Sequence, residues 1–271
     1  MTVQTSMAPG AVPPPPRRSL AERGPDIALW GGLAILLAIS FGPAELHKLP
    51  LLISNSSNMQ ELGRGFLSPD FTNWRLFVGK MWQTIQMAVW GTALAILAAA
   101  PLGLLASRNI TPVFIQLPVR RFLDIVRSVP DLVIGMIFLV AVGPGPFAGV
   151  MALSIGTSGV LAKLFSEAVE SIDKGPVEGV RATGGAKIHE IVWGVIPQVA
   201  PLWTSYALYR FESNSRSATV LGLIGAGGIG QVLFDSLNGF AYSSTAAIVL
   251  VIIVAVSLID MLSQAIRSRL L

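Results

Sequence analysis

Four polar or charged side chains lie close together in a stretch of the chain that is otherwise apolar. They are Arg210, Glu212, Asn214 and Arg216. Residues 191–209 before them and 217–234 after them carry no charge. If residues 199–221 cross a membrane, Arg210 lies about 16 Å into the crossing at roughly 1.5 Å per residue, near the midplane. Charges at that depth are costly and mark either a function or an internal pairing.

Two chemical roles are open for this cluster. Arginine holds an oxyanion with its planar fork of N–H donors, so the cluster predicts an anion pathway, to which Arg127 in an earlier span also belongs. Alternatively, Glu212 pairs with Arg216, four residues along the same helical face, or with Arg210, so that neither charge stands bare in lipid. Both roles hold together if one arginine pairs and the other does not.

Five glycines occupy the nine residues from Gly222 to Gly230, a composition that disfavours a regular helix. Part of the segment matches the Gly-x-Gly-x-x-Gly pattern of dinucleotide sites. In such sites the pattern follows a strand of a soluble βαβ unit. Here it follows the predicted membrane span 199–221, so a dinucleotide site is not expected. We predict close backbone packing and a gate at the outer mouth, formed by Gly225, Gly227, Gly228 and Gly230.

Residues 166–198 form the one sizeable loop on the inner side of the predicted membrane. Pro176 favours the first turn of a helix, and Gly184-Gly185 favours its end. A second helix is predicted from Ala186 to Pro197. A helix, a tight turn and a helix make a stiff element, which is typical of a docking site rather than of a linker.

The elements that position these residues follow from composition. Hydrophobic residues make up 52% of the 271 residues and charged residues 13%, with a mean hydropathy of +0.66. This composition predicts an all-α, polytopic membrane protein, because so few charges cannot cover a soluble globule. The uncharged stretches and the Gly143–Pro146 turn predict six spans, at 27–43, 81–107, 121–142, 147–166, 199–221 and 244–265. A separate crossing by 217–234 would make seven.

Three regions are expected along the chain. Residues 1–26, with Pro13 to Pro16, predict a disordered cytoplasmic tail. Residues 27–80 hold the first span and an outer segment, and residues 81–271 hold the core domain with its 166–198 loop. Twelve of the nineteen lysines and arginines fall on the side of the N-terminus and four on the other, which predicts that both termini are cytoplasmic. The net charge of +4 therefore reflects the inner face and not nucleic-acid binding.

The sequence contains few of the residues that an enzyme active site would need. The chain has no cysteine, and its two histidines, His47 and His189, lie far apart, so neither a catalytic site nor a metal site is predicted. No Gly-x-x-x-x-Gly-Lys-Ser/Thr phosphate loop is present, so this chain is expected to bind no cofactor.

The loop resembles a motif of importer permeases of the ATP-binding-cassette class, written Glu-Ala-Ala, three residues, Gly, nine residues, Ile, one residue, Leu-Pro. Glu178, Gly184, Ile196 and Pro197 fall on that spacing, while Gly179, Val180 and Gly194 depart from it. The stretch from Tyr206 to Gly230 is similar to permeases of phosphonate importers, a group that includes phosphite and phosphate relatives. The resemblance covers about residues 80–271.

The resemblance implies a type I importer permease fold and a function in alternating access. A second copy of the chain would complete the pathway, and two separate ATPase subunits would bind ATP and Mg. A periplasmic or lipid-anchored binding protein would deliver a phosphonate, phosphate or phosphite at the inner membrane of a prokaryote. The coupling residues it implies are Glu178, Gly179, Arg181, Ala182, Thr183, Gly184 and Lys187. The alternatives are a permease for another small solute, such as an amino acid, and an ATP-independent channel or secondary transporter.

Overall fold

The computed structural model describes residues 20–54 and 56–269, and every regular element within them is a helix. The chain divides into two compact units, Met1–Gln60 and Glu61–Leu271. The helices described up to the boundary are α1 (Leu20–Phe41), η1 (Leu46–Lys48), α2 (Leu51–Ser54) and α3 (Ser56–Leu67), the last of which continues into the second unit.

Of the predicted tail, residues 1–19 lie outside the described residues. Residues 20–26 belong to α1, which begins seven residues before the predicted span, because Leu20 to Arg23 are good helix formers.

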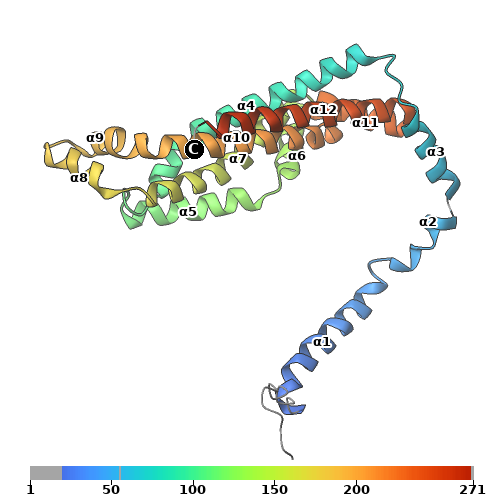
Figure 1. Cartoon of the computed structure of the whole chain (residues 1–271), viewed down its shortest axis with the longest axis horizontal. Helices are drawn as coiled ribbons and strands as arrows, with labels where there is room; N and C mark the ends of the chain where they lie inside the picture. Colours follow the sequence, from blue (N-terminus) through green and yellow to red (C-terminus); the bar gives the residue numbers. More distant parts are fainter. Residues whose placement is uncertain (1–19, 55, 270–271) are drawn as a thin grey trace, which may run out of the picture. The chain divides into compact units, whose positions relative to one another are not determined.

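Long helices build the second unit. They are α4 (Trp74–Ala106), α5 (Val113–Ser128), α6 (Asp131–Val142), α7 (Pro146–Glu170), α8 (Lys174–Ala182), α9 (Lys187–His189), the π-helical turn η2 (Glu190–Val195), α10 (Ile196–Leu221), the π-helical turn η3 (Gly222–Ala226), α11 (Gly228–Asn238) and α12 (Tyr242–Arg267). Figure 1 shows α4, α7, α10 and α12 running lengthwise together, with α8 and α9 at one end of this bundle. We call this the α8 end, and the opposite end the α11 end.

Small side chains let α4 and α7 pack closely. Gly91, Ala95, Ala99 and Gly103 repeat every fourth residue and form one stripe along α4. A Cβ atom added at Gly91 would lie 2.7 Å from Cβ of Leu153, and one added at Gly103 would lie 2.7 Å from Cβ of Phe165. Close approach of small-residue stripes is the usual way in which membrane helices associate.

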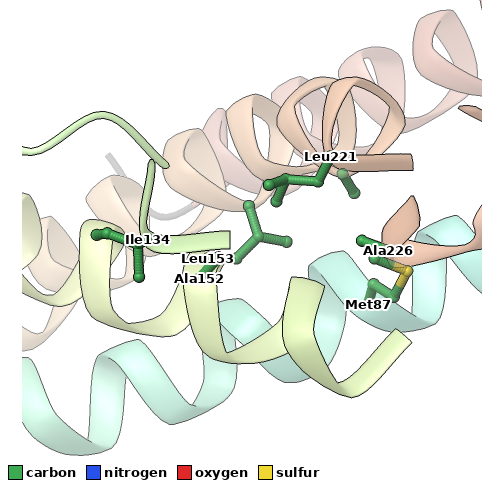
Figure 2. Close-up of a cluster of buried hydrophobic side chains, with 7 residues drawn as sticks. Met87, Ile134, Ala152, Leu153, Leu221 and Ala226 are labelled. Atoms are coloured by element: carbon green, nitrogen blue, oxygen red, sulfur yellow. The ribbon is translucent and has the colours of Figure 1, made fainter. Parts of the chain in front are cut away.

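A buried apolar cluster fixes α6 against this pair. Figure 2 shows its residues converging from α4, α6, α7, α10 and η3: Met87, Ile134, Ala152, Leu153, Leu221 and Ala226. Gly135 on α6 has no room for a side chain, because an added Cβ would lie 2.7 Å from Cδ2 of Leu221. The first turns of α6 are therefore held against α7 and the C-terminal end of α10.

Among the described residues, four helices are long and apolar enough to cross a membrane, namely α1 from Gly24, α4, α7 and α12. Two further crossings are counted if each of two bent helix pairs is one span. The prediction of an all-α, polytopic membrane protein is confirmed, and six spans agree with the higher count. The second span is longer than predicted, because α4 begins at Trp74 and not at residue 81.

The third predicted span, 121–142, is not a single helix. α5 starts earlier, at Val113, and α6 continues from it at an angle of 85°. The break falls at Val129 and Pro130, where Val129 is extended. Proline lacks an N–H and disfavours the helical conformation of the residue before it, which explains the bend.

The second helix of the 166–198 loop was predicted to end at Pro197, and this prediction is wrong. The helix runs on from Lys187 to Ala226 through η2 and α10. A π-helical turn widens the helix before Pro197, and Nε2 of Gln198 donates a 2.6 Å hydrogen bond to the carbonyl of Gly194. Ile196, the residue before Pro197, keeps a helical conformation, so the helix passes this proline without ending.

Candidate functional site

A chain of buried hydrogen bonds joins α4, α7 and α10 near the midpoint of α4. Thr157 Oγ1 donates to Asn214 Oδ1 at 2.8 Å, and Asn214 Nδ2 donates to Thr92 Oγ1 at 2.8 Å. Thr92 Oγ1 donates in turn to the carbonyl of Ala88 at 2.7 Å. Thr157 and Asn214 have no exposed surface. These satisfied polar groups fix the register of the three helices.

Arg210 adds one link to this chain of hydrogen bonds. Its Nη2 donates to Oγ1 of Thr157 at 3.3 Å, while its Nε is buried without a hydrogen-bond partner. Arg210 and Asn214 therefore lie on one face of α10 and contact the same residue of α7, as their spacing predicts. Arg210 therefore keeps a buried N–H donor without a hydrogen-bond partner near the middle of the bundle.

Asp131 also belongs to this region, although the sequence did not single it out. It is the first residue of α6 and interacts electrostatically with Arg210. The sequence did contain one indication that Asp131 has a role, namely a carboxylate directly after Pro130 at the start of an apolar stretch. Its neighbourhood with Arg210 depends on the packing of α6 against α7 and α10, which no local pattern reveals.

Glu212 and Arg216 lie in a separate cluster between α10 and α12. Nη2 of Arg216 is 3.2 Å from Oε1 of Glu212, which confirms the predicted four-residue pairing. Arg216 also contacts Asp260 at 3.4 Å, and Arg267 contacts Glu212 at 3.4 Å. Two acids and two bases balance here. The structure therefore brings Arg210 and Asn214 together and places Glu212 and Arg216 elsewhere.

Arg127, near the end of α5, pairs with Asp124 at 3.5 Å on the same helix, and Lys163 of α7 contacts the same carboxylate at 3.1 Å. Its side chain is exposed. None of the contacts described for it reaches the Arg210 cluster.

The glycine segment is irregular, as predicted. Gly225, Gly227 and Gly228 have positive φ angles of 100°, 82° and 71°. A side chain on Gly230 would collide with the carbonyl of Thr219, and one on Gly222 would meet the Gly227 carbonyl at 2.6 Å. The turns and the close packing account for these glycines, so their match to the dinucleotide-binding pattern needs no nucleotide site to explain it.

Two side chains of α4 hold the start of α11. The backbone N–H of Gly228 donates to Oε1 of Gln83 at 3.2 Å, and that of Ile229 donates to Oγ1 of Thr84 at 2.8 Å. These N–H groups would otherwise be unsatisfied at a helix start. The predicted gate residues are thus fastened to α4 at the α11 end of the bundle.

At the other end, α8 stands off the bundle as a short helix. Asp173 caps it by accepting from the N–H of Gly175 at 3.0 Å. Gly184, with a φ of 81°, reverses the chain after it, and no atom lies within 4 Å of a Cβ added there. The predicted turn is therefore confirmed, and it leaves Glu178, Gly179 and Thr183 exposed on α8 and at its end.

Packing of α8 on η2 explains one departure from the importer motif. A Cβ atom at Gly194, where the motif has isoleucine, would lie 3.0 Å from Cα of Val177. Between α8, η2 and the α4–α5 connection lies a pocket of about 450 Å³. Charged residues on its walls are Lys174, Glu178, Arg181, Lys187 and Glu190.

An ion pair ties α8 to η2. Arg181 Nε and Nη2 donate to the two carboxylate oxygens of Glu190 at 2.8 and 2.9 Å, a bidentate arrangement. The hydrogen bond from Arg181 lowers the pKa of Glu190 below its ordinary value, and Glu190 raises the pKa of Arg181. Both groups are therefore charged at neutral pH.

A bundle of membrane-spanning helices, an arginine near its middle and a stiff loop at one end together define the membrane subunit of a transport system. Comparison with known proteins gives the family. The chain belongs to the family described as "Binding-protein-dependent transport system inner membrane component", which matches residues 91–271. It is therefore a transport subunit of the inner membrane and not an enzyme.

Individual relatives agree with this assignment. The chain is 36% identical over 264 residues to the phosphite transport system permease protein PtxC of Stutzerimonas stutzeri, which covers 94% of this chain and 96% of the relative. It is 44% identical over 189 residues to the phosphate-import permease protein PhnE of Mycolicibacterium smegmatis, covering 69% and 36%. An inward-facing structure of the MetNI methionine transporter has the same fold, with a TM-score of 0.66, 20% identity and coverage of 74% and 99%.

Proposed function

We propose that this chain is the permease of an ATP-driven importer for a phosphorus oxyanion, such as a phosphonate, phosphate or phosphite. The relatives named for phosphite and phosphate transport support this substrate class. The observation that carries the proposal is Arg210, which lies near the middle of the bundle with a buried Nε that has no partner. Arginine binds such oxygens through paired N–H donors.

The complete importer contains two copies of this chain, which form the pathway between them. Two ATPase subunits bind ATP and Mg, and a periplasmic or lipid-anchored binding protein delivers the anion. The α8 end faces the cytoplasm with both termini. Residues 27–80 hold the first transmembrane helix and an extracytoplasmic segment, and residues 81–271 form the core domain. The lysine and arginine distribution supports this orientation.

Coupling to the ATPase proceeds through α8 and the turn after it. The exposed Glu178, Gly179 and Thr183 offer contacts, and the bidentate pair of Arg181 with Glu190 makes α8 and η2 move as one body. Because η2 continues without a break into α10, displacement of α8 reaches Arg210 directly. Ala182 and Lys187 flank the turn.

The anion passes Arg210 with weak contacts, since a site that bound it tightly would also trap it. Asn214 supports Arg210 through Thr157 and does not contact the anion itself. Glu212 and Arg216 pair with each other, and Arg216 also pairs with Asp260, so they contribute to the electrostatic potential of the pathway and do not bind the anion. The gate at Gly225 to Gly230 closes the α11 end.

The test is to co-purify the tagged chain with the ATPase and binding protein encoded beside it and to measure ATP hydrolysis in lipid. The panel contains methylphosphonate, phosphite, phosphate and the neutral amino acid methionine. We expect one phosphorus oxyanion, delivered by its binding protein, to raise the rate at least several-fold. Stimulation by methionine alone would point to a permease for another solute. Transport without an associated ATPase would point to a channel or secondary transporter.

A further inference from the structure

Asp131 has an unusual position for a carboxylate in an apolar bundle. It begins α6 directly after the 85° bend, and its Oδ1 occupies the space where Gly156 of α7 would carry a side chain. The next residue of α7, Thr157, accepts the hydrogen bond from Arg210. The glycine at 156 therefore admits Asp131 to the level of Arg210.

The two charges attract each other without being paired. Among the described residues, Asp131 forms no ion pair within 4.0 Å and no side-chain hydrogen bond, although it interacts electrostatically with Arg210. Arg210 uses Nη2 on Thr157, whose own hydroxyl proton goes to Asn214, and its Nε has no partner. Both charges are partly buried and under-satisfied, which is costly unless a third group bridges them.

The chemistry of this third group follows from its two neighbours. Arg210 supplies only donors, so it takes deprotonated oxygens. A carboxylate supplies only acceptors, so Asp131 takes a group that carries a proton. A phosphorus oxyanion that keeps one P–OH group offers both on a single tetrahedral centre. An anion of equal charge without that proton would place its oxygens against the carboxylate and be repelled.

We propose that Asp131 is a specificity-determining residue that accepts a hydrogen bond from the P–OH group of the transported anion while Arg210 holds the deprotonated oxygens. This inference rests on the proposed function and adds to it. The permease itself then selects anions that carry a P–OH group, in addition to any selection by the binding protein.

The test measures binding to the permease directly. The probes are methylphosphonate, which as a monoanion keeps a P–OH group, and its monomethyl ester, a monoanion that has none. Both are titrated at millimolar concentration, near pH 6, into the permease–ATPase complex in lipid nanodiscs without ATP or binding protein, and ³¹P line broadening reports the Kd. We expect the wild type to bind methylphosphonate about tenfold more tightly than the ester, a difference that one hydrogen bond to a charged group supplies.

Asp131→Asn should reduce this preference to within about twofold, and Arg210→Gln should abolish binding of both probes. The control is Asp235→Asn, which removes an exposed acid of α11 and should keep the wild-type preference. A purely structural role for Asp131, as a counter-charge to Arg210, predicts that Asp131→Asn with Arg210→Gln restores uptake. Our proposal predicts that this double variant assembles with the ATPase but binds neither probe.

Two outcomes overturn the inference separately from the proposed function. If the wild type transports phosphorus oxyanions and Asp131→Asn retains the full preference for methylphosphonate, only the role of Asp131 is wrong. Uptake of phosphorus oxyanions restored in the double variant would show that the two residues only balance each other's charge, which overturns the role of Asp131 and of Arg210 as anion ligands but not the substrate class. If the wild type neither binds nor transports any phosphorus oxyanion, the proposed function is wrong as well.

Discussion

Asn214 is the side chain on which the register of three helices depends. It is fully buried and bonded to Thr157 and Thr92. Replacement by leucine, which has a similar volume, would leave both threonines without this partner. Each interhelical hydrogen bond in a membrane is worth about 0.6 to 1.7 kcal/mol, so Asn214→Leu should lower the free energy of unfolding by about 1 to 3 kcal/mol.

Thermal unfolding of the purified complex in lipid measures this loss. Asn238→Leu, at the exposed end of α11, is the matched control, since it removes the same group from a position without buried partners. Equal melting temperatures for the two variants would show that the buried amide does not hold the helices together.

Single residues differed in how far the sequence could predict their surroundings. The pairing of Glu212 with Arg216 and the shared face of Arg210 and Asn214 followed from helical spacing alone. Thr92 and Thr157 escaped notice, because a threonine in a membrane helix ordinarily bonds to its own backbone. Their role depends on contacts between helices, and helical periodicity carries no information about which helices are neighbours.

Among the elements, α8 is joined to η2 by the Arg181–Glu190 pair, and this junction should depend on pH. The pKa of Glu190 is lowered in the folded protein, so its contribution to stability is complete above the ordinary glutamate pKa of about 4.3. It is lost as the pH falls through the depressed folded value. We therefore expect α8 to loosen only in acid, below about pH 4.3, and to stay fixed at neutral pH.

Spin labels report this loosening. The sequence has no cysteine, so cysteines introduced at the exposed Gly179 and Trp193 are labelled selectively. The distance distribution between them should broaden on acidification, and Glu190→Gln should broaden it already at neutral pH. Glu167→Gln, which changes an exposed acid of α7, should behave like the parent. A sharp distribution at neutral pH in Glu190→Gln would show that apolar packing alone holds α8.

Helix boundaries were predicted well where a turn residue decides them and poorly where proline does. Gly184 ends the loop helix because its φ is positive, and the sequence showed this. Pro130 bends the third span and Pro197 does not end the helix before α10, although the two residues look alike in sequence. The difference lies in the residue before each proline: Val129 is extended, whereas Ile196 keeps a helical conformation after the π-helical turn η2.

For the whole molecule, one surface of the bundle is too polar for lipid. Arg75, Lys80, Gln83 and Gln86 lie along one side of α4 around an open pocket of about 340 Å³. The 33 residues of α4 span about 50 Å, against a hydrocarbon core of about 30 Å. The uncharged part of the helix, residues 81–106, is centred near Leu94, so the core begins near residue 84. Gln86 then lies inside the core on an exposed face.

An exposed glutamine at that depth requires water or a polar neighbour, so this face of α4 should line the pathway or meet the second copy rather than lipid. We expect a cysteine at Gln86 to react with a water-soluble maleimide, added to both sides of the membrane, at least tenfold faster than one at Val89, which is also exposed but apolar. A pathway face predicts in addition that substrate and ATP together change the rate at Gln86. A second copy packed on this face predicts instead that two Gln86→Cys chains cross-link. Slow labelling without cross-linking would place this side of α4 in lipid, and the pathway would then have to run along α10 alone.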